Sequence, residues 1–141
     1  MTPEQLQMDT DALRSAGLNI TAQRLAVYRT VRRAEHILAD DLYDRVREEI
    51  GTVSRQAVYD ALNIMTENGL LRRTQPAGFT ARYELKKDNH HHLVCRKCAQ
   101  MVDTDCRTGA APCLEPGDAH GFVIDEAEVI YWGLCPECQK L

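Results

Sequence analysis

Two Cys-x-x-Cys motifs constrain this chain more than any other feature of its sequence. Cys95 and Cys98 form the first motif, and Cys135 and Cys138 form the second. A Cys-x-x-Cys turn directs two sulfurs toward one metal, and two such turns supply the four thiolates of a closed tetrahedral zinc site. Residues 99–134 separate the motifs, which is longer than a zinc-ribbon spacer, so the site would clasp the beginning and end of a lobe. We predict a structural Zn²⁺ on which folding of that lobe depends.

The cysteines have other interpretations. The N-terminus, "MTPEQLQMDT", lacks the features of a secretory signal, so we expect a cytoplasmic protein in which disulfides are disfavoured. A redox dithiol normally occurs as one Cys-x-x-Cys in a βαβ context, which is absent here, and buried cysteines without metal are the remaining possibility. We therefore expect a protein that is not an enzyme. A thiol oxidoreductase remains as the alternative among enzymes. No apolar run is long enough to span a membrane, so no membrane partner is expected.

The first half of the chain reads as helices followed by a β-hairpin. Capping residues, glycine stops and apolar residues at helical spacing predict four helices, over residues 3–16, 22–33, 39–50 and 55–68. Residues 70–85 look like two short strands joined by a Pro/Gly turn, with the second near Ala81 to Leu85. Helices followed by a β-hairpin make a winged helix.

The character of the sequence changes after residue 85. Polar residues 86–89 are turn-prone and predict a hinge. Beyond them, the segments rich in β-branched or aromatic residues read as strands, at residues 91–95, 100–106 and 122–135. The predicted fold class is α+β, with a winged helix over residues 1–85 and a small, zinc-clasped second domain over residues 90–141.

Three consecutive histidines precede the first Cys-x-x-Cys motif. Because side chains alternate along a strand, His90 and His92 share one face while His91 points to the other. Asp103, on the next predicted strand, can lie beside the pair. Two imidazoles and a carboxylate suit a divalent cation such as Fe²⁺, Mn²⁺ or Zn²⁺. The alternative is that these histidines are simply exposed or hydrogen-bonded side chains. For His36, the local sequence supports only this alternative.

At this point the sequence closely resembles the ferric uptake regulator (Fur) family of bacterial metal-dependent repressors over nearly its whole length. The motifs that carry the resemblance are "TAQR" at 21–24, "HILADDLY" at 36–43, "SRQAVYDAL" at 54–62, "ARYE" at 81–84, "HHHLVCRKC" at 90–98 and the final "CPEC". The resemblance implies a DNA-binding winged helix and an α/β dimerisation domain with a four-cysteine zinc site. It also implies a regulatory metal site formed by His36, Glu84, His90, His92 and Asp103.

That site implies a switch. Its ligands come from the DNA-binding lobe, the junction and the dimerisation lobe, so a cation bound by all of them would favour one interdomain orientation. The metal is then a corepressor, expected to be Fe²⁺, with Mn²⁺ or Zn²⁺ as alternatives. The expected partners are a second copy of the chain and double-stranded operator DNA.

The predicted reading element is the helix after Ser54, whose N-terminal residues Arg55, Gln56 and Tyr59 would enter the major groove. A solvated helix face would be their default role without the winged-helix context. Asp60 departs from relatives that have a basic residue there, so their operators cannot be assumed. Further candidate phosphate contacts are Arg24, Arg72, Arg73 and Arg82. The net charge of -4 argues only against strong non-specific binding of polyanions.

The resemblance is closest to the FurA type of actinobacteria and the PerR-like peroxide-sensing branch, which carries aspartate at the position of Asp103. In that branch peroxide reacts with bound Fe(II), a ligating histidine is oxidised, and DNA is released; FurA types usually repress a catalase-peroxidase gene. Oxidation of Cys106 and Cys113 is a competing route, although both can equally be inert. A weak third metal site is partly matched by His91, His120 and Glu126. An iron- or zinc-uptake repressor and a zinc-stabilised protein-interaction module are the remaining alternatives.

Overall fold

The computed structural model describes residues 2–76, 78–86, 90–105 and 114–140. The chain divides into two compact units, residues 1–86 and 87–141, which are treated separately below. The predicted hinge at residues 86–89 lies largely outside the described residues. Within the described residues, no helix has both the length and the apolar character needed to cross a membrane.

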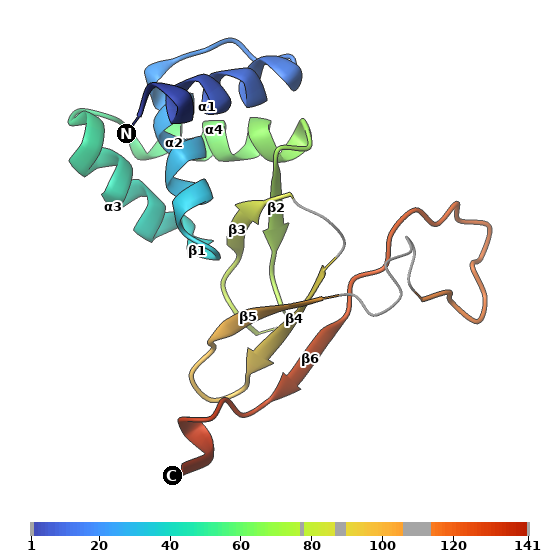
Figure 1. The fold of residues 1–141 in the computed structure, drawn as a ribbon. Coiled ribbons are helices and arrows are strands. Elements are labelled where there is room, and N and C mark those ends of the chain that lie inside the picture. Colours follow the sequence, from blue (N-terminus) through green and yellow to red (C-terminus); the bar gives the residue numbers. More distant parts are fainter. Residues whose placement is uncertain (1, 77, 87–89, 106–113, 141) are drawn as a thin grey trace. The chain divides into compact units, whose positions relative to one another are not determined.

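Figure 1 shows the helices of the N-terminal unit, and most of them begin at a residue whose side chain caps the helix. Thr2 caps the first helix in a capping box with Gln5, and the hydroxyls of Thr21 and Ser54 accept the N–H of the third residue of the second and fourth helices. The third helix instead begins after Leu38 with no side-chain cap. The helices are α1 (Pro3–Ser15), α2 (Ala22–Arg33), α3 (Ala39–Ile50) and α4 (Arg55–Glu67).

A three-stranded antiparallel sheet completes this unit. Its strand order is β1-β3-β2, formed by β1 (Ile37–Leu38), β2 (Leu71–Thr74) and β3 (Arg82–Leu85). The β2–β3 hairpin is the wing, and Gly78 in its turn has a φ of +84°, which favours glycine. The unit is therefore the predicted winged helix, preceded by the additional helix α1.

The apolar stripes of the four helices and of β2 form one core in the N-terminal unit. Its fully buried members include Leu13, Val27, Val31, Leu42, Val46, Val58, Leu62 and Met65. Burying each of these side chains contributes about 1.5–3 kcal/mol. This core fixes the position of α4 relative to the helices that support it.

The C-terminal unit has a second small sheet. It contains β4 (His90–Cys95), β5 (Met101–Asp105) and β6 (Ile130–Gly133), followed by the 3₁₀ turn η1 (Cys138–Lys140). The order is β5-β4-β6, with β4 antiparallel to β5 and parallel to β6. The prediction of a strand over residues 122–135 was therefore too long. Residues 122–129 have β-branched and aromatic side chains, but apart from the hydrogen bond from His92 to Val129 they form no backbone pairing with a described strand, and composition alone does not make a strand.

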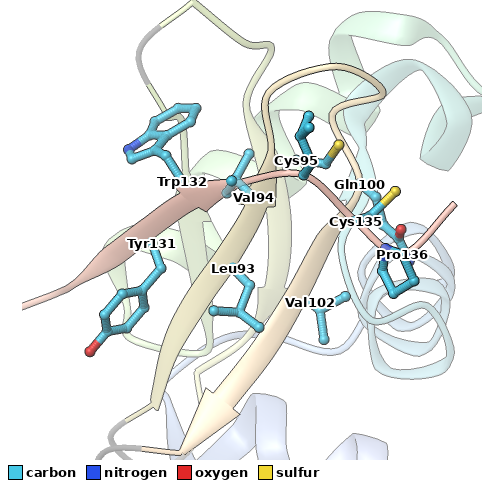
Figure 2. Close-up of a pocket in the computed structure, with 11 residues that line it drawn as sticks. Leu93, Val94, Cys95, Gln100, Val102, Tyr131, Trp132, Cys135 and Pro136 are labelled. Carbon is cyan, nitrogen blue, oxygen red and sulfur yellow. The ribbon is translucent and has the colours of Figure 1, made fainter. Parts of the chain in front are cut away.

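The core of the C-terminal unit is thin. Among its described residues, the buried apolar side chains are Val94, Cys95 and Met101. On the opposite face Leu93, Val102 and Tyr131 are cross-strand neighbours that stand side by side (Figure 2) and remain 45%, 43% and 52% exposed. They line an apolar cleft of about 500 Å³. So small a core needs support from a metal or a partner.

Candidate metal centres and DNA-reading helix

The two Cys-x-x-Cys motifs converge at one end of the C-terminal sheet. β4 and β6 are parallel neighbours whose ends are paired through Cys95 and Gly133, so the turn after each strand begins at the same edge. One sulfur from each of Cys95, Cys98, Cys135 and Cys138 lies within 4.8 Å of the other three. The Cys98 and Cys135 sulfurs are 3.7 Å apart. Tetrahedral Zn–S bonds of about 2.3 Å require sulfurs about 3.8 Å apart, so the cluster fits zinc.

The pKa values of the thiols show why this cluster suits a cation. Backbone N–H groups of Cys98 and Cys135 lower the pKa of Cys95 to about 6, which favours its thiolate. Hydrogen bonding with Cys135 raises the pKa of Cys138 to about 12. Four thiolates therefore cannot coexist here without a compensating positive charge, which a divalent metal supplies.

A second set of ligand atoms lies on the face of the C-terminal sheet opposite Leu93 and Val102. His92 and Asp103 are directly paired across β4 and β5, and His92 Nε2 is 3.4 Å from Asp103 Oδ1. The other ring nitrogen, Nδ1, is 3.3 Å from Oε1 of Glu128. Glu128 was not among the ligands predicted from the sequence, because residues 122–135 were interpreted as a strand and only Glu126 of this acidic segment was considered as a metal ligand. His90 begins β4, and its side chain lies outside the described residues.

The N-terminal unit contains its own pair of imidazole and carboxylate. His36 precedes β1, Glu84 lies on β3, and pairing of Ile37 with Tyr83 brings the two together. His36 Nε2 is 2.8 Å from Glu84 Oε2. Each unit therefore contributes one imidazole and one carboxylate of the predicted regulatory set.

The three residues suggested for a third metal site do not form one group in the part of the chain that the structure describes. His91 is buried, and its Nδ1 accepts a hydrogen bond from the backbone N–H of Val129 at 3.1 Å. His120 is an exposed residue 3.6 Å from Asp118, and Glu126 is also exposed. His91 thus fastens the chain before β6 to β4. Cys106 and Cys113 lie outside the described residues.

The first turns of α4 carry the predicted DNA-reading side chains. Arg55 and Gln56 are exposed and Tyr59 is half-buried. Carboxylates hold all three: Asp40 accepts hydrogen bonds from Arg55 Nη1 at 2.7 Å and from the Tyr59 hydroxyl at 2.8 Å, and Gln56 Nε2 donates to Asp60 at 2.8 Å. These hydrogen bonds orient the three predicted DNA-contacting side chains in the structure without DNA.

The other candidate phosphate contacts have structural partners of their own. Arg24 donates to the carbonyl of Asn19, and Arg73 donates to the side chain of Gln75. Arg82 donates to the carbonyl of His36 at 3.2 Å. Arg72 stands opposite Glu84 in the β2–β3 register. Arg72 and Arg82 thus lie beside the His36–Glu84 pair.

A winged helix, a small sheet with a four-cysteine cluster, and imidazole–carboxylate pairs in both units together define a class of metal-responsive DNA-binding regulators. The chain belongs to the Ferric uptake regulator family, whose sequence profile matches residues 15–131. Members of this family are metal-dependent transcriptional regulators.

Three similar proteins place the chain within the family. It is 50% identical over 129 residues to the transcriptional regulator FurA of Mycobacterium tuberculosis, covering 91% of this chain and 88% of FurA. It is 54% identical over 124 residues to ferric uptake regulation protein 1 of Mycolicibacterium fortuitum, covering 87% and 77%. The crystal structure of the Campylobacter jejuni peroxide stress regulator superposes with a TM-score of 0.67 at 25% identity, covering 98% and 100%.

Proposed function

We propose that this protein is a transcriptional repressor that binds operator DNA as a homodimer when loaded with Fe(II), and that peroxide releases it. One observation carries the proposal: His36 with Glu84 in the winged helix, and His92 with Asp103 in the other unit, each form a close imidazole–carboxylate pair. Neither pair alone completes the coordination of a divalent cation, and the mixed donors suit Fe²⁺ or Mn²⁺. A cation that takes ligands from both pairs and from His90 would favour one arrangement of the two units.

The four-cysteine cluster is assigned to structural Zn²⁺. The sulfur spacing, the lowered pKa of Cys95 and the thin core around it support this assignment. The two proposed sites would then hold different metals. The four sulfur donors suit structural Zn²⁺, whereas the nitrogen and oxygen donors of the regulatory site suit Fe²⁺ or Mn²⁺.

DNA binding is assigned to α4, with Arg55, Gln56 and Tyr59 in the major groove. The exposed first turns of α4 and the wing beside it support this role. The apolar row of Leu93, Val102 and Tyr131 supports a partner on the C-terminal sheet. A two-fold dimer would read a pseudo-palindromic operator.

Peroxide sensing is assigned to the histidines of the regulatory set, namely His36, His90 or His92. Bound Fe(II) would supply the redox chemistry: the net reaction transfers one oxygen atom from peroxide to the imidazole ring and releases water. The oxidised ring is a poorer ligand, so the cation and then the DNA would leave. Similarity to FurA and to a peroxide stress regulator supports this assignment, with a catalase-peroxidase gene as the expected target.

Peptide mass spectrometry on anaerobically Fe(II)-loaded protein tests the proposal, before and after brief exposure to peroxide. We expect one added oxygen on a peptide that carries His36, His90 or His92. We also expect release of a DNA duplex that was first selected for binding to the metal-loaded protein. Mn(II)-loaded protein is the control and should stay unmodified. Unmodified histidines in the iron form would overturn the peroxide assignment.

A double variant distinguishes oxidation of the thiols from oxidation of the histidines. Replacing Cys106 and Cys113 together with serine should leave peroxide-dependent release of DNA intact. Loss of the response in that variant would move the sensing chemistry from the histidines to the thiols.

A repressor of metal uptake is the second candidate, and the 54% identity to a ferric uptake regulation protein favours it. In that case a chelator would release the DNA, whereas peroxide would not. Measuring both releases on the same selected duplex distinguishes the two candidates.

A further inference from the structure

Three contacts fasten residues 128–129 to β4. The backbone N–H of His92 donates to the carbonyl of Val129 at 3.2 Å. The N–H of Val129 donates to Nδ1 of His91 at 3.1 Å. Glu128 Oε1 lies 3.3 Å from Nδ1 of His92. The location of the Glu128 backbone is thus set by the sheet, although the sequence before it has no regular structure.

His92 has a carboxylate at each ring nitrogen. Asp103 is 3.4 Å from Nε2, and Glu128 is 3.3 Å from Nδ1. The lone pairs of the two nitrogens point in diverging directions, so one cation cannot bind both. Asp103 is grouped with His92 as a proposed metal ligand and Glu128 is not, so the nitrogen beside Asp103, Nε2, is assigned to the cation and Nδ1 is left to Glu128.

We propose that Glu128 is a positioning residue of the regulatory metal site: it accepts the Nδ1–H of His92 and so presents the Nε2 lone pair to the cation. This inference rests on the proposed metal-dependent function and adds a residue to it. The distance of 3.3 Å exceeds the usual N–H···O length of about 2.9 Å. A shift of about 0.4 Å would bring the 33% exposed Glu128 side chain to that length.

The physical effect of such a carboxylate is known in general terms. A metal-bound histidine whose other nitrogen donates to a carboxylate is held in one tautomer and one orientation, and it becomes a stronger electron donor. Removal of this partner typically lowers metal affinity by about 10–100-fold.

The neighbouring histidine provides an internal reference. Nδ1 of His91 accepts a hydrogen bond from an N–H, so the neutral ring of His91 must carry its proton on Nε2. Nδ1 of His92 would carry the proton instead. Adjacent residues of the same strand should therefore show opposite tautomers.

The experiment compares Glu128→Ala and Glu128→Gln with the wild-type chain, all zinc-replete and full length. Asp125→Asn is the matched control, because it removes an exposed carboxylate from the same segment. Calorimetric titration with Mn(II) measures affinity, and two-dimensional ¹H–¹⁵N spectra of histidine-labelled protein before Mn(II) is added report each tautomer.

We expect Glu128→Ala to lower Mn(II) affinity by about 10–100-fold and to convert His92 from the Nδ1–H form to a mixture of tautomers. Glu128→Gln keeps an acceptor and should retain most of the affinity. His91 should remain in the Nε2–H form throughout, which shows that the strand is intact. Asp125→Asn should match the wild type.

Two results would overturn the positioning role. Wild-type affinity and an unchanged His92 tautomer in Glu128→Ala would mean that Glu128 does not act on the ring. Equal losses in the Ala and Gln variants, with the His92 tautomer unchanged, would mean that Glu128 binds the cation directly. Failure of the wild-type chain to bind Mn(II) or Fe(II) at all would instead refute the proposed metal-dependent function.

Discussion

Arg55 donates a hydrogen bond from Nη1 to Oδ1 of Asp40 at 2.7 Å, which joins the first turn of α4 to the first turn of α3. The same oxygen accepts the hydroxyl of Tyr59 at 2.8 Å, and the Arg55 guanidinium lies 4.4 Å from the ring centroid of Tyr43. Asp40 therefore orients two of the side chains that we propose to contact DNA, while its charge would oppose their contact with phosphate. Non-specific DNA binding, which depends on phosphate contacts, should be weakened by this arrangement.

Replacing Asp40 with asparagine should strengthen binding to duplex DNA of random sequence. Arg55 would then be free to contact a phosphate, and one additional contact steepens the slope of log K against log salt concentration by about 0.9. Fluorescence anisotropy of a labelled random duplex, measured over a series of salt concentrations on the metal-loaded protein, gives the slope directly.

Asp41→Asn is the control for this prediction. Asp41 is exposed in the same first turn of α3, so its replacement removes an equal charge and an equal interaction with the helix dipole. We expect a smaller change in slope than for Asp40→Asn. Equal slopes for the two variants would show that Asp40 acts only through net charge and not through Arg55.

A buried ion pair attaches α1 to the winged helix. Asp9 on α1 is 1% exposed, and its two carboxylate oxygens accept from Nε and Nη2 of Arg32 on α2 at 2.8 and 3.0 Å. Removing one partner of a buried pair costs about 3–5 kcal/mol, and the partial exposure of Arg32 favours the lower end. We expect Asp9→Ala to lower the free energy of unfolding by about 3 kcal/mol.

Urea unfolding followed by far-ultraviolet circular dichroism measures this loss, because the described α-helices all belong to the N-terminal unit. Asp11→Ala serves as the control: its only described partner is the exposed side chain of Gln7, and the change should stay within about 0.5 kcal/mol. If both variants lose the same stability, Asp9 contributes no more than an exposed helical aspartate.

The N-terminal unit was largely predictable from the sequence because its signals are local. Thr2, Thr21 and Ser54 supply hydroxyls at helix starts, and the helices begin directly after them. The four-cysteine cluster was equally accessible, since each motif is a self-contained turn. Residues 122–129 were misread because their composition favours a strand while strand formation depends on a partner elsewhere in the chain.

The missed residues act through contacts distant in sequence. Glu128 reaches His92 only because β6 pairs in parallel with β4, and Asp40 reaches Arg55 only because α3 packs near α4. Local patterns carry no information about either register or packing. His36 is the intermediate case: its local sequence is uninformative, but the β1–β3 register places it beside Glu84.

Removal of zinc should unfold the C-terminal unit and spare the winged helix. The thin core of the C-terminal unit leaves the metal as its main support, whereas the N-terminal unit has a large core. Trp132, the only tryptophan in the chain, lies on β6 with the Arg96 guanidinium 5.1 Å from its ring centroid. We expect a strong chelator, or Cys95→Ser, to change the Trp132 fluorescence while the helical circular dichroism is kept.

The readouts separate the possible results. Readdition of Zn²⁺ to the chelated wild-type chain should restore the fluorescence, but it should not restore that of Cys95→Ser. A zinc-free chain with unchanged Trp132 fluorescence would contradict the role of the cluster in folding. Joint loss of fluorescence and helical signal would mean that the two units do not unfold independently.

The apolar row of Leu93, Val102 and Tyr131 should be part of the dimer interface. These side chains are cross-strand neighbours, and each is roughly half exposed. A glutamate at position 93 would bring an unpaired charge into a buried apolar surface, which costs several kcal/mol, and two-fold symmetry makes the change twice per dimer. We expect Leu93→Glu to be a monomer by analytical ultracentrifugation at concentrations where the wild type is a dimer.

Leu114→Glu, at an exposed residue outside the sheet, should remain dimeric. Trp132 fluorescence verifies that the monomer is still folded, and a folded Leu93→Glu dimer would exclude this row from the interface.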